Sequence, residues 1–532
     1  MTVKKGRGRL AGAGLIALGV LVLCALGVFW PRRATDGRKS DTVSFTVGTR
    51  TYVLTLEDVT MGEPRFDTPD VRPLCTRTRM VVPLLGSAAQ GETPPETGTV
   101  TLTVDETDAG TVFYLSSDSP AGVRAVLTTQ DDDKLTVRAV DPDDEETAEP
   151  AAPRFGMAYS PDSALYLEGD AVHLYLSRPS ALTALGQSVY VCKSPVAGAS
   201  LARGEGTLSL LLPLPAGLAS CSGIVTDRTL VNWASPEAHT NVRNLDASVV
   251  GYHLQADGVY IAMPDTYRPY DAQADGRHIY RAATAWLLGP CTYDTNGPMF
   301  TALGKSIIYR YLDGVNEQGF LPTEPSSTWL SGEYGIGAGF YDTRFNFDTM
   351  KRLMRAETLW NDPAIGKTVQ RMVSFYLDFA DAAQFKAYDA TFVPDYGHPA
   401  PNSVAPSKAA CSLNHYLTEA LLLLRAGERY GDDRATARGY DILKSIDDTA
   451  ARWITPGRDL WYAIRQDGKM EKPDYIQVTY LDLADAAHLL TKYGVWNDYP
   501  GIQALLALKE EWLIDHGYRD MLTRFPEFTA FG

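Results

Sequence analysis

The sequence has little cysteine and no excess of positive charge. None of its six cysteines stands in the C-x-x-C spacing of a structural zinc site, and we predict neither a metal nor a cofactor. Lysine and arginine number 49 against 65 acidic residues, a formal net charge of −16. Such a charge repels polyanions, so we predict no nucleic-acid partner. It also counts against an acidic polysaccharide substrate unless the binding cleft is locally basic.

The chain is too long for one compact core. Its 532 residues, 45% apolar and 21% charged, are typical of a globular protein with two or three domains. We predict a cytoplasmic tail and anchor over 1–40, a β-rich domain over 41–215, a transitional β segment over 216–270 and a helical domain over 271–532.

The N-terminal segment predicts a single membrane span. Residues 10–30 read LAGAGLIALGVLVLCALGVFW, 21 uncharged residues preceded by four basic ones. As a helix they would extend about 31 Å, the thickness of a bilayer core. A short tail before a long body predicts a single-pass membrane protein with its C-terminal body extracytoplasmic. A cleaved signal peptide is the alternative, because Ala25-Leu26-Gly27 resembles a cleavage site.

Five cysteines lie beyond this segment, so they cannot all pair within one chain. Cys192 and Cys221 both flank β-type runs and are the predicted disulfide if the body is exported. Five buried thiols are the alternative.

The sequence changes its hydrophobic period near residue 275. Short alternating runs with Gly, Pro and Asp between them fill 42–215 and predict an all-β sandwich or barrel. A further hairpin is predicted around Asp257-Gly258. From 275 onward about eight segments have helical spacing, the first over 275–288, and they predict stacked helical hairpins in an α/α toroid or part of one.

Residues 459–483, DLWYAIRQDGKMEKPDYIQVTYLDL, interrupt the helical pattern with two tyrosines and an arginine. A tyrosine is a poor base at its usual pKa of about 10, but a nearby arginine favours the phenolate. Arginine also binds carboxylates through two parallel hydrogen bonds. Tyr462, Tyr475 and Arg465 therefore predict a site for proton transfer on an anionic substrate, and ordinary packing is the alternative.

Two other loops contain candidate site residues. Residues 392–424 place Asp395, Tyr396 and His398 in a proline-rich loop, followed by Asn414 and His415 near the start of a helix, whose N-terminus attracts anions. Residues 321–350 have four glycines between 332 and 339, which require tight turns or close approach. Aromatic and polar groups stand around these glycines, as in a sugar subsite: Trp329, Glu333, Tyr341, Asp342, Arg344 and Asn346.

Taken in order, the motifs PDYGHP, SLNHYLTEALLLL, WYAIRQ and DYIQVTYLDLADAAHLL resemble the C-terminal domain of D-glucuronyl C5-epimerases over residues 392–515. The resemblance implies that Tyr396, Tyr462 and Tyr475 are the functional tyrosines and that Arg465 binds the substrate carboxylate. Asp395 stands where that family has glutamate, and Ile476 and Thr479 stand where it has paired histidines.

The resemblance implies a membrane-anchored enzyme that inverts C5 of uronic-acid residues in a polysaccharide. Arg465 would neutralise the carboxylate, one tyrosine would remove the C5 proton, and another would return a proton to the opposite face. Three alternatives stay open. They are a toroidal uronate lyase using the Asn414-His415 pair, a six-hairpin glycosidase using Glu333 with Asp342 or Asp348, and a polysaccharide-binding protein without catalysis. The oligomeric state is also open.

Overall fold

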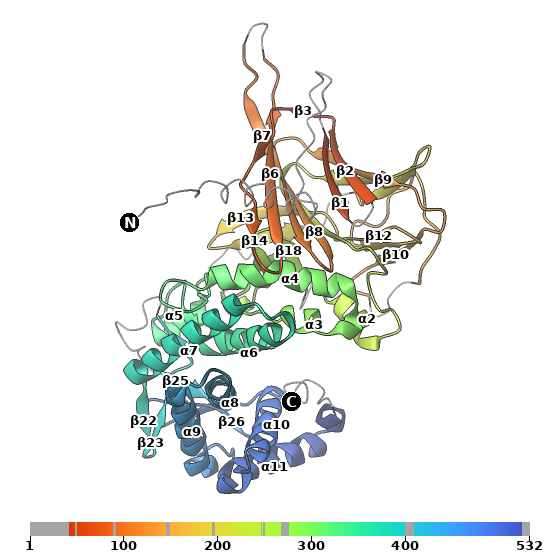
Figure 1. Cartoon of the computed structure of the whole chain (residues 1–532). Helices are drawn as coiled ribbons and strands as arrows, with labels where there is room; N and C mark the ends of the chain where they lie inside the picture. The colour runs from red at the N-terminus through yellow and green to blue at the C-terminus, as the bar shows by residue number, and fades with distance from the viewer. Residues whose placement is uncertain are drawn as a thin grey trace, which may run out of the picture.

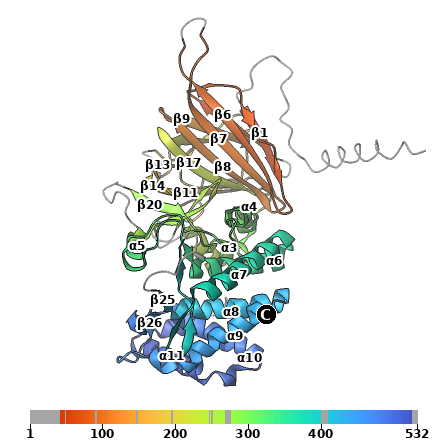
Figure 2. The same ribbon diagram turned by 90° about the vertical axis from the view of Figure 1, so that its left-hand side faces the viewer.

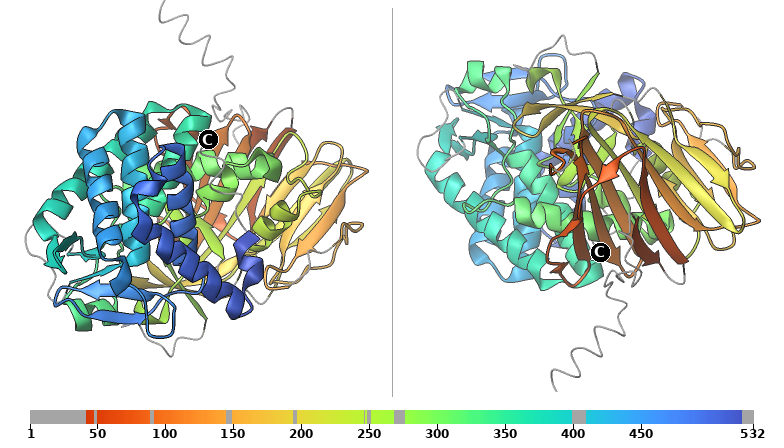
Figure 3. Two further views of the ribbon diagram at one scale, coloured as in Figure 1. Left: turned by 90° about the horizontal axis from the view of Figure 1, so that it is seen from below. Right: turned by 90° about the horizontal axis from the view of Figure 1, so that it is seen from above.

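The structure is a computed structural model. It describes residues 42–523 except 48–49, 89–91, 145–148, 194–196, 246, 248–250, 268–275 and 399–408. Strands form the N-terminal half and helices most of the C-terminal half, with helix α4 between them (Figures 1 and 2). The views from below and above show the same division (Figure 3).

Two antiparallel sheets make up the β-rich half. The smaller has the order β1 (Thr42–Val47), β2 (Arg50–Glu57), β9 (Val123–Gln130), β16 (Thr207–Leu214) and β15 (Ser200–Arg203). The main path of the larger runs β18 (Tyr252–Gln255), β19 (Gly258–Ala262), β20 (Arg277–Arg281), β14 (Val189–Lys193), β13 (Ser180–Gly186), β17 (Gly217–Val225), β8 (Gly110–Ser119), β7 (Glu96–Thr107), β6 (Thr76–Leu85) and β3 (Thr60–Met61). Its side branches are β4 (Arg65–Phe66) and β5 (Asp70–Val71) on β6, and β12 (His173–Leu176), β11 (Ala164–Glu168) and β10 (Thr136–Val140) leading from β17.

Period-two alternation explains why the two sheets pack face to face. Every second residue of β9 is buried, beginning with Val123, Ala125 and Leu127, because successive side chains point to opposite faces of a strand. They join one apolar cluster with residues of both sheets. Phe45 of the smaller sheet lies 5.8 Å from Phe113 of the larger, measured between ring centroids.

The helices follow in chain order, and most of them contact a helix that is next to them in the chain. They are α2 (Pro236–Arg243), α3 (Leu288–Cys291), α4 (Pro298–Gly314), α5 (Thr328–Tyr334), α6 (Thr343–Trp360), α7 (Pro363–Ala383), α8 (Leu413–Tyr430), α9 (Asp433–Asp448), α10 (Val478–Lys492) and α11 (Pro500–Asp515), with the 3-10 turns η1 (Asp265–Tyr267), η2 (Asp294–Asn296), η3 (Ala450–Arg452), η4 (Trp496–Asp498) and η5 (Arg519–Thr523).

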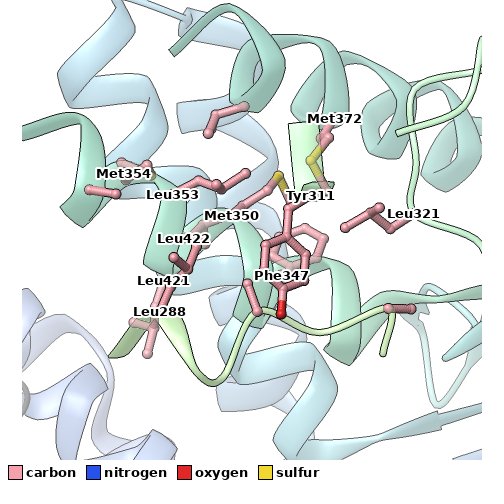
Figure 4. Close-up of a cluster of buried hydrophobic side chains, with 14 of the residues drawn as sticks. Leu288, Tyr311, Leu321, Phe347, Met350, Leu353, Met354, Met372, Leu421 and Leu422 are labelled. Carbon is pink, nitrogen blue, oxygen red and sulfur yellow. The ribbon is translucent and has the colours of Figure 1, made fainter. Parts of the chain in front are cut away.

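The last six helices form two layers. Helices α6, α8 and α10 contact one another in turn, and α7, α9 and α11 lie outside them. Apolar side chains of α3, α4, α6, α7 and α8 meet in one buried cluster (Figure 4). Helix α8 is buried on nearly all sides, which explains its run of four leucines.

Short strands also lie within the helical half. They are the pairs β21 (Tyr341–Asp342) with β24 (Tyr396–Gly397) and β22 (Phe385–Ala387) with β23 (Ala390–Phe392), and the sheet β25 (Ala410–Ser412), β26 (Trp461–Arg465) and β27 (Met470–Pro473). The described chain is about 35% helix and 34% strand. The predicted fold class, an all-β region followed by an all-α toroid, is therefore wrong.

Two local predictions have opposite outcomes. The hairpin expected around Asp257-Gly258 is confirmed, since β18 and β19 pair there. The helix expected over 275–288 is wrong, because residues 277–281 form β20 between β14 and β19. Backbone pairing on both edges outweighs the helical spacing of the apolar residues.

The predicted membrane span, residues 10–30, lies outside the described residues. Within the described part of the chain, no helix is both long and apolar enough to cross a membrane. The five cysteines beyond it are all buried. Strand β13 separates the strands of Cys192 and Cys221, a spacing of about 10 Å that exceeds the roughly 7 Å limit between bridged Cα atoms.

A buried polar network joins the larger sheet to α4. Arg77 donates two 2.6 Å hydrogen bonds to Asp105, whose side chain is fully buried. Ser306 of α4 donates to the same carboxylate at 2.6 Å and is 2.7 Å from the Tyr114 hydroxyl. The sheet and the helices are therefore coupled through one carboxylate.

Replacing Asp105 with alanine should lower the free energy of unfolding by about 3–5 kcal/mol, because Arg77 would keep a buried charge without its partner. Urea unfolding at pH 7 measures this. The matched control is Asp67→Ala, which removes an exposed ion pair with Arg79 on the same strand as Arg77 and should cost about 1 kcal/mol or less. Equal losses in the two variants would contradict the coupling.

Candidate functional site

Four segments far apart in the sequence meet at one apolar cluster. The loop around α5, the β21–β24 pair, the β25–β26 pair and the edge of the larger sheet at β14, β19 and β20 all contribute to it. Its buried members are Val189, Ile261, Tyr267, Tyr280, Ala282, Leu330, Tyr334, Ile336, Phe340, Ala410 and Ala463, with Trp329, Tyr396 and Tyr462 packed against them. The three sequence regions singled out as candidates therefore converge.

Asp395 is the one carboxyl of the predicted catalytic set, and its pKa is strongly raised. Its side chain is buried, and its two oxygens accept from the backbone N–H of Ser412 at 2.7 Å and from the Ser412 hydroxyl at 2.6 Å. Burial raises the pKa of Asp395 to about 8, although both bonds oppose the rise. At neutral pH this carboxyl is largely protonated and is a proton donor.

Ser412 is a member of the candidate site that the sequence analysis missed. It is the N-cap of α8, yet its side chain makes no capping hydrogen bond, because its hydroxyl donates to Asp395 instead. A serine before a strong helical pattern is an ordinary capping signal. Only the fold reveals this second role.

His415 is neutral in this environment. Its Nδ1 lies 2.8 Å from the Thr343 hydroxyl and 3.8 Å from Asp395 Oδ1. Burial lowers the pKa of His415 to about 3, with the charge of Arg344 as the next cause. Its neighbour Asn414 is also buried, and the amide oxygen of Asn414 has no hydrogen-bond partner among the described residues.

Tyr462 and Tyr475 contact each other edge to face. Their ring centroids are 5.4 Å apart with an interplanar angle of 88°, which leaves no room for a sugar ring between them. Burial raises the pKa of both phenols, and the negative charge of Asp395 adds to the rise. We predicted that a nearby arginine would favour the phenolate and so lower the pKa of these tyrosines. The pKa values are raised instead, so this prediction is wrong.

Side chains that can carry protons lie between the solvent and Asp395. Tyr475 is 54% exposed and its ring contacts the ring of Tyr462. Ser412 lies close enough to Tyr462 to lower the pKa of that phenol, against the larger effect of burial. Ser412 then donates to Asp395. We call these four residues the tyrosine relay. Each member has a hydroxyl or carboxyl group that can both give and take a proton.

Tyr396 lies beside the relay but packs differently. It pairs with Asp342 across β21 and β24, and its ring lies 5.8 Å from both Trp329 and His415. Burial raises its pKa well above 10. His398 is partly buried just after β24.

Arg465 lies on β26, but its charge is already engaged. Its guanidinium is 3.1 Å from Glu471 and 3.9 Å from Asp467. On the same hairpin, the Lys472 ammonium is 3.9 Å from Glu333 and 4.6 Å from the Trp329 ring centroid. The positive charges of Arg465 and Lys472 are therefore largely neutralised by neighbouring carboxylates.

The remaining residues predicted to bind substrate stabilise the fold around the site. Tyr341 packs between Phe320, Phe375 and Phe379. Asn346 bonds both the N–H and the C=O of Leu321, and Arg344 donates to Asp482 and to the Asn414 carbonyl.

Asp342 caps α6 by accepting from the N–H of Phe345 at 3.0 Å. Burial raises its pKa to about 7. In the described part of the chain, no three His, Cys, Asp or Glu side chains are placed to hold a metal ion. Carboxyl and phenol groups such as those of Asp395, Tyr462 and Tyr475 can transfer protons.

No protein-family model and no curated protein matches the sequence. Among solved structures, the chain is similar to cellobiose 2-epimerase from Spirochaeta thermophila, with 13% identity over 43% of this chain and 56% of that chain and a TM-score of 0.33. A family 76 glycoside hydrolase from a bovine Bacteroides thetaiotaomicron strain has 10% identity over 74% and 76% and a TM-score of 0.37. A GH8 endo-β-1,4-glucanase from an Achatina fulica gut metagenomic library has 15% identity over 52% and 88% and a TM-score of 0.31.

All three are carbohydrate-active enzymes with an (α/α)-toroid-type fold. The chain spans little more than half the length of the cellobiose 2-epimerases that it matches. These identities and TM-scores are too low to assign an activity to this chain.

Proposed function

We propose that this protein is a carbohydrate-modifying enzyme that transfers protons to or from a sugar at the tyrosine relay. The observation that supports the proposal is the placement of the exposed Tyr475 against Tyr462, next to the hydrogen-bonded pair of Ser412 and Asp395, whose pKa is raised to about 8. Perturbed pKa values of this kind cluster at functional sites.

The surface around Tyr475 suits a sugar ring. Tyr475 and Ile476 are exposed at 54% and 41%, and Trp329 of α5 is partly buried against the same apolar cluster as Tyr462. Pyranose rings have apolar faces and polar rims, so an aromatic surface flanked by polar groups binds them. Because the two tyrosine rings contact each other, the sugar lies against the exposed side of Tyr475 rather than between the rings.

The protons move together, so that no serine alkoxide forms, once the phenol hydroxyls turn to bond their neighbours. As a base, the ionised Asp395 takes the hydroxyl proton that Ser412 donates to it, Ser412 takes the proton of Tyr462, Tyr462 takes that of Tyr475, and Tyr475 takes one from the substrate. As an acid, the protonated Asp395 gives its proton to Ser412 after the serine hydroxyl has turned toward Tyr462, and Tyr475 gives its phenolic proton to the substrate. Asp395 is then ionised until solvent returns a proton.

The finer reaction that we propose is inversion of C5 in a uronic-acid residue of a polysaccharide, in which Tyr475 removes the C5 proton on one face and solvent returns a proton to the opposite face. The Arg465 guanidinium is available to a substrate carboxylate if that group displaces Glu471. Glycoside hydrolysis is the second candidate, favoured by the protonated Asp395, since a glycosidase needs a carboxylic acid as proton donor.

The test incubates residues 41–532 with a panel of uronic-acid and neutral polysaccharides in deuterated water. Deuterium at C5 without cleavage supports epimerisation, and new reducing ends without unsaturation support hydrolysis. Absorbance near 232 nm indicates the lyase instead. Failure to observe any of these products across the panel would contradict the enzyme proposal.

Replacing Tyr475 with phenylalanine should lower turnover about 100-fold on whichever substrate reacts, because the terminal proton donor is lost while the ring remains. The matched control is Tyr388→Phe. Tyr388 is also exposed and hydrogen-bonds to Gly468 in the turn of the same hairpin, but it lies outside the relay. Initial rates of the two variants should therefore differ, and similar rates would contradict the role of Tyr475.

A further inference from the structure

Lys509 of α11 is a buried lysine in the last helix. Its side chain has no exposed surface, and its ammonium lies 4.6 Å from the Trp512 ring centroid. A buried ammonium is costly unless it is paired. The fold must therefore supply partners for it.

Two carboxylates from another part of the chain are those partners. Lys509 Nζ is 2.7 Å from Asp459 Oδ1 and 3.2 Å from Asp474 Oδ2. Asp474 also accepts from the Thr479 hydroxyl of α10 at 2.6 Å, and its backbone N–H donates to the Leu460 carbonyl. One ammonium thus holds both ends of the β26–β27 hairpin against α11.

The position of these carboxylates in the sequence connects Lys509 to the relay. Asp474 directly precedes Tyr475, and Asp459 precedes Tyr462 by three residues. Tyr475 itself is 54% exposed, so its own packing constrains it little. Its contact with Tyr462 therefore depends on where the backbone at 459–460 and 474–475 is held.

We infer that Lys509 is a positioning residue for the tyrosine relay. By pairing with Asp459 and Asp474, it fixes the two ends of the hairpin so that the rings of Tyr462 and Tyr475 stay in contact. Its role in turnover rests on the proposed function, but its effect on the geometry of Tyr475 does not.

The test uses residues 41–532 labelled with 3-fluorotyrosine, with the Tyr475 signal in the 19F NMR spectrum assigned by its loss in Tyr475→Phe. Lys509→Met keeps the length of the side chain and removes the charge. It should shift or broaden the Tyr475 signal and lower kcat about 10-fold with a smaller change in KM. Asp474→Asn keeps the shape of the carboxyl, weakens the same ion pair and should move the signal in the same direction if Lys509→Met does not fold.

The matched control is Arg458→Ala, which removes an exposed ion pair with Glu511 between the same loop and the same helix. This variant should leave the Tyr475 signal and kcat unchanged. A Tyr475 signal that stays at the wild-type position in Lys509→Met or Asp474→Asn would overturn the inference. A shifted signal in a protein that modifies no carbohydrate would support the inference and contradict the proposed function.

Discussion

Replacing Asp395 with asparagine should lower turnover by about 100-fold or more. The amide has nearly the shape of the carboxyl but cannot supply a proton, and loss of a general acid typically costs 10²–10⁴-fold in rate. The pKa of about 8 keeps the wild-type carboxyl largely protonated at neutral pH. Turnover that uses this proton should therefore fall as the pH rises through about 8. Rates measured from pH 5 to 9 on the substrate identified by the panel test both expectations.

Asp342→Asn is the matched control for this prediction. Asp342 is also buried with a raised pKa, of about 7, but it caps α6 rather than joining the relay. Asparagine is as good an N-cap as aspartate, so this variant should lose less than about 10-fold in turnover. Equal losses of turnover in the two variants would mean that turnover needs any buried carboxyl in this region. They would contradict a specific role for the relay through Ser412.

The sequence predicted the regular elements better than their association. Period-two runs correctly indicated strands such as β9, and helical spacing correctly indicated α4 and α6. Residues 275–288 have apolar positions that fit a helix, but β20 forms there because β14 and β19 offer partners on both edges. Such pairing is a long-range property that a local pattern does not contain.

The candidate site was predicted as three separate loops, and the fold brings them together. Tyr396, Tyr462 and Asp395 meet because the short strands β24, β25 and β26 lie side by side around the start of α8. The pKa of the tyrosines could not be predicted from the nearby arginine. Its direction depends on burial, and Arg465 is engaged by Glu471 instead.

The dependence of stability on pH gives a test of Asp395 that does not require a substrate. The pKa of Asp395 is about 8 in the folded protein and about 4 in an unfolded chain. Between these values the folded state binds more protons than the unfolded state. The contribution of this group to the free energy of unfolding therefore decreases as the pH rises, by up to about 1.4 kcal/mol per pH unit.

Asp395→Asn isolates this contribution from the other titrating groups. The neutral His415, whose pKa is lowered to about 3, makes stability rise with pH below about 6.5, so the total curve of either protein is a sum of opposing effects. That effect is common to both proteins and cancels in the difference. The free energy of unfolding of Asp395→Asn minus that of the wild type should therefore rise by roughly 3–4 kcal/mol between pH 5 and pH 8. Urea unfolding of both proteins at intervals of one pH unit measures this difference. Parallel curves of unfolding free energy against pH would mean that Asp395 is ionised in the folded protein and cannot donate a proton to the relay.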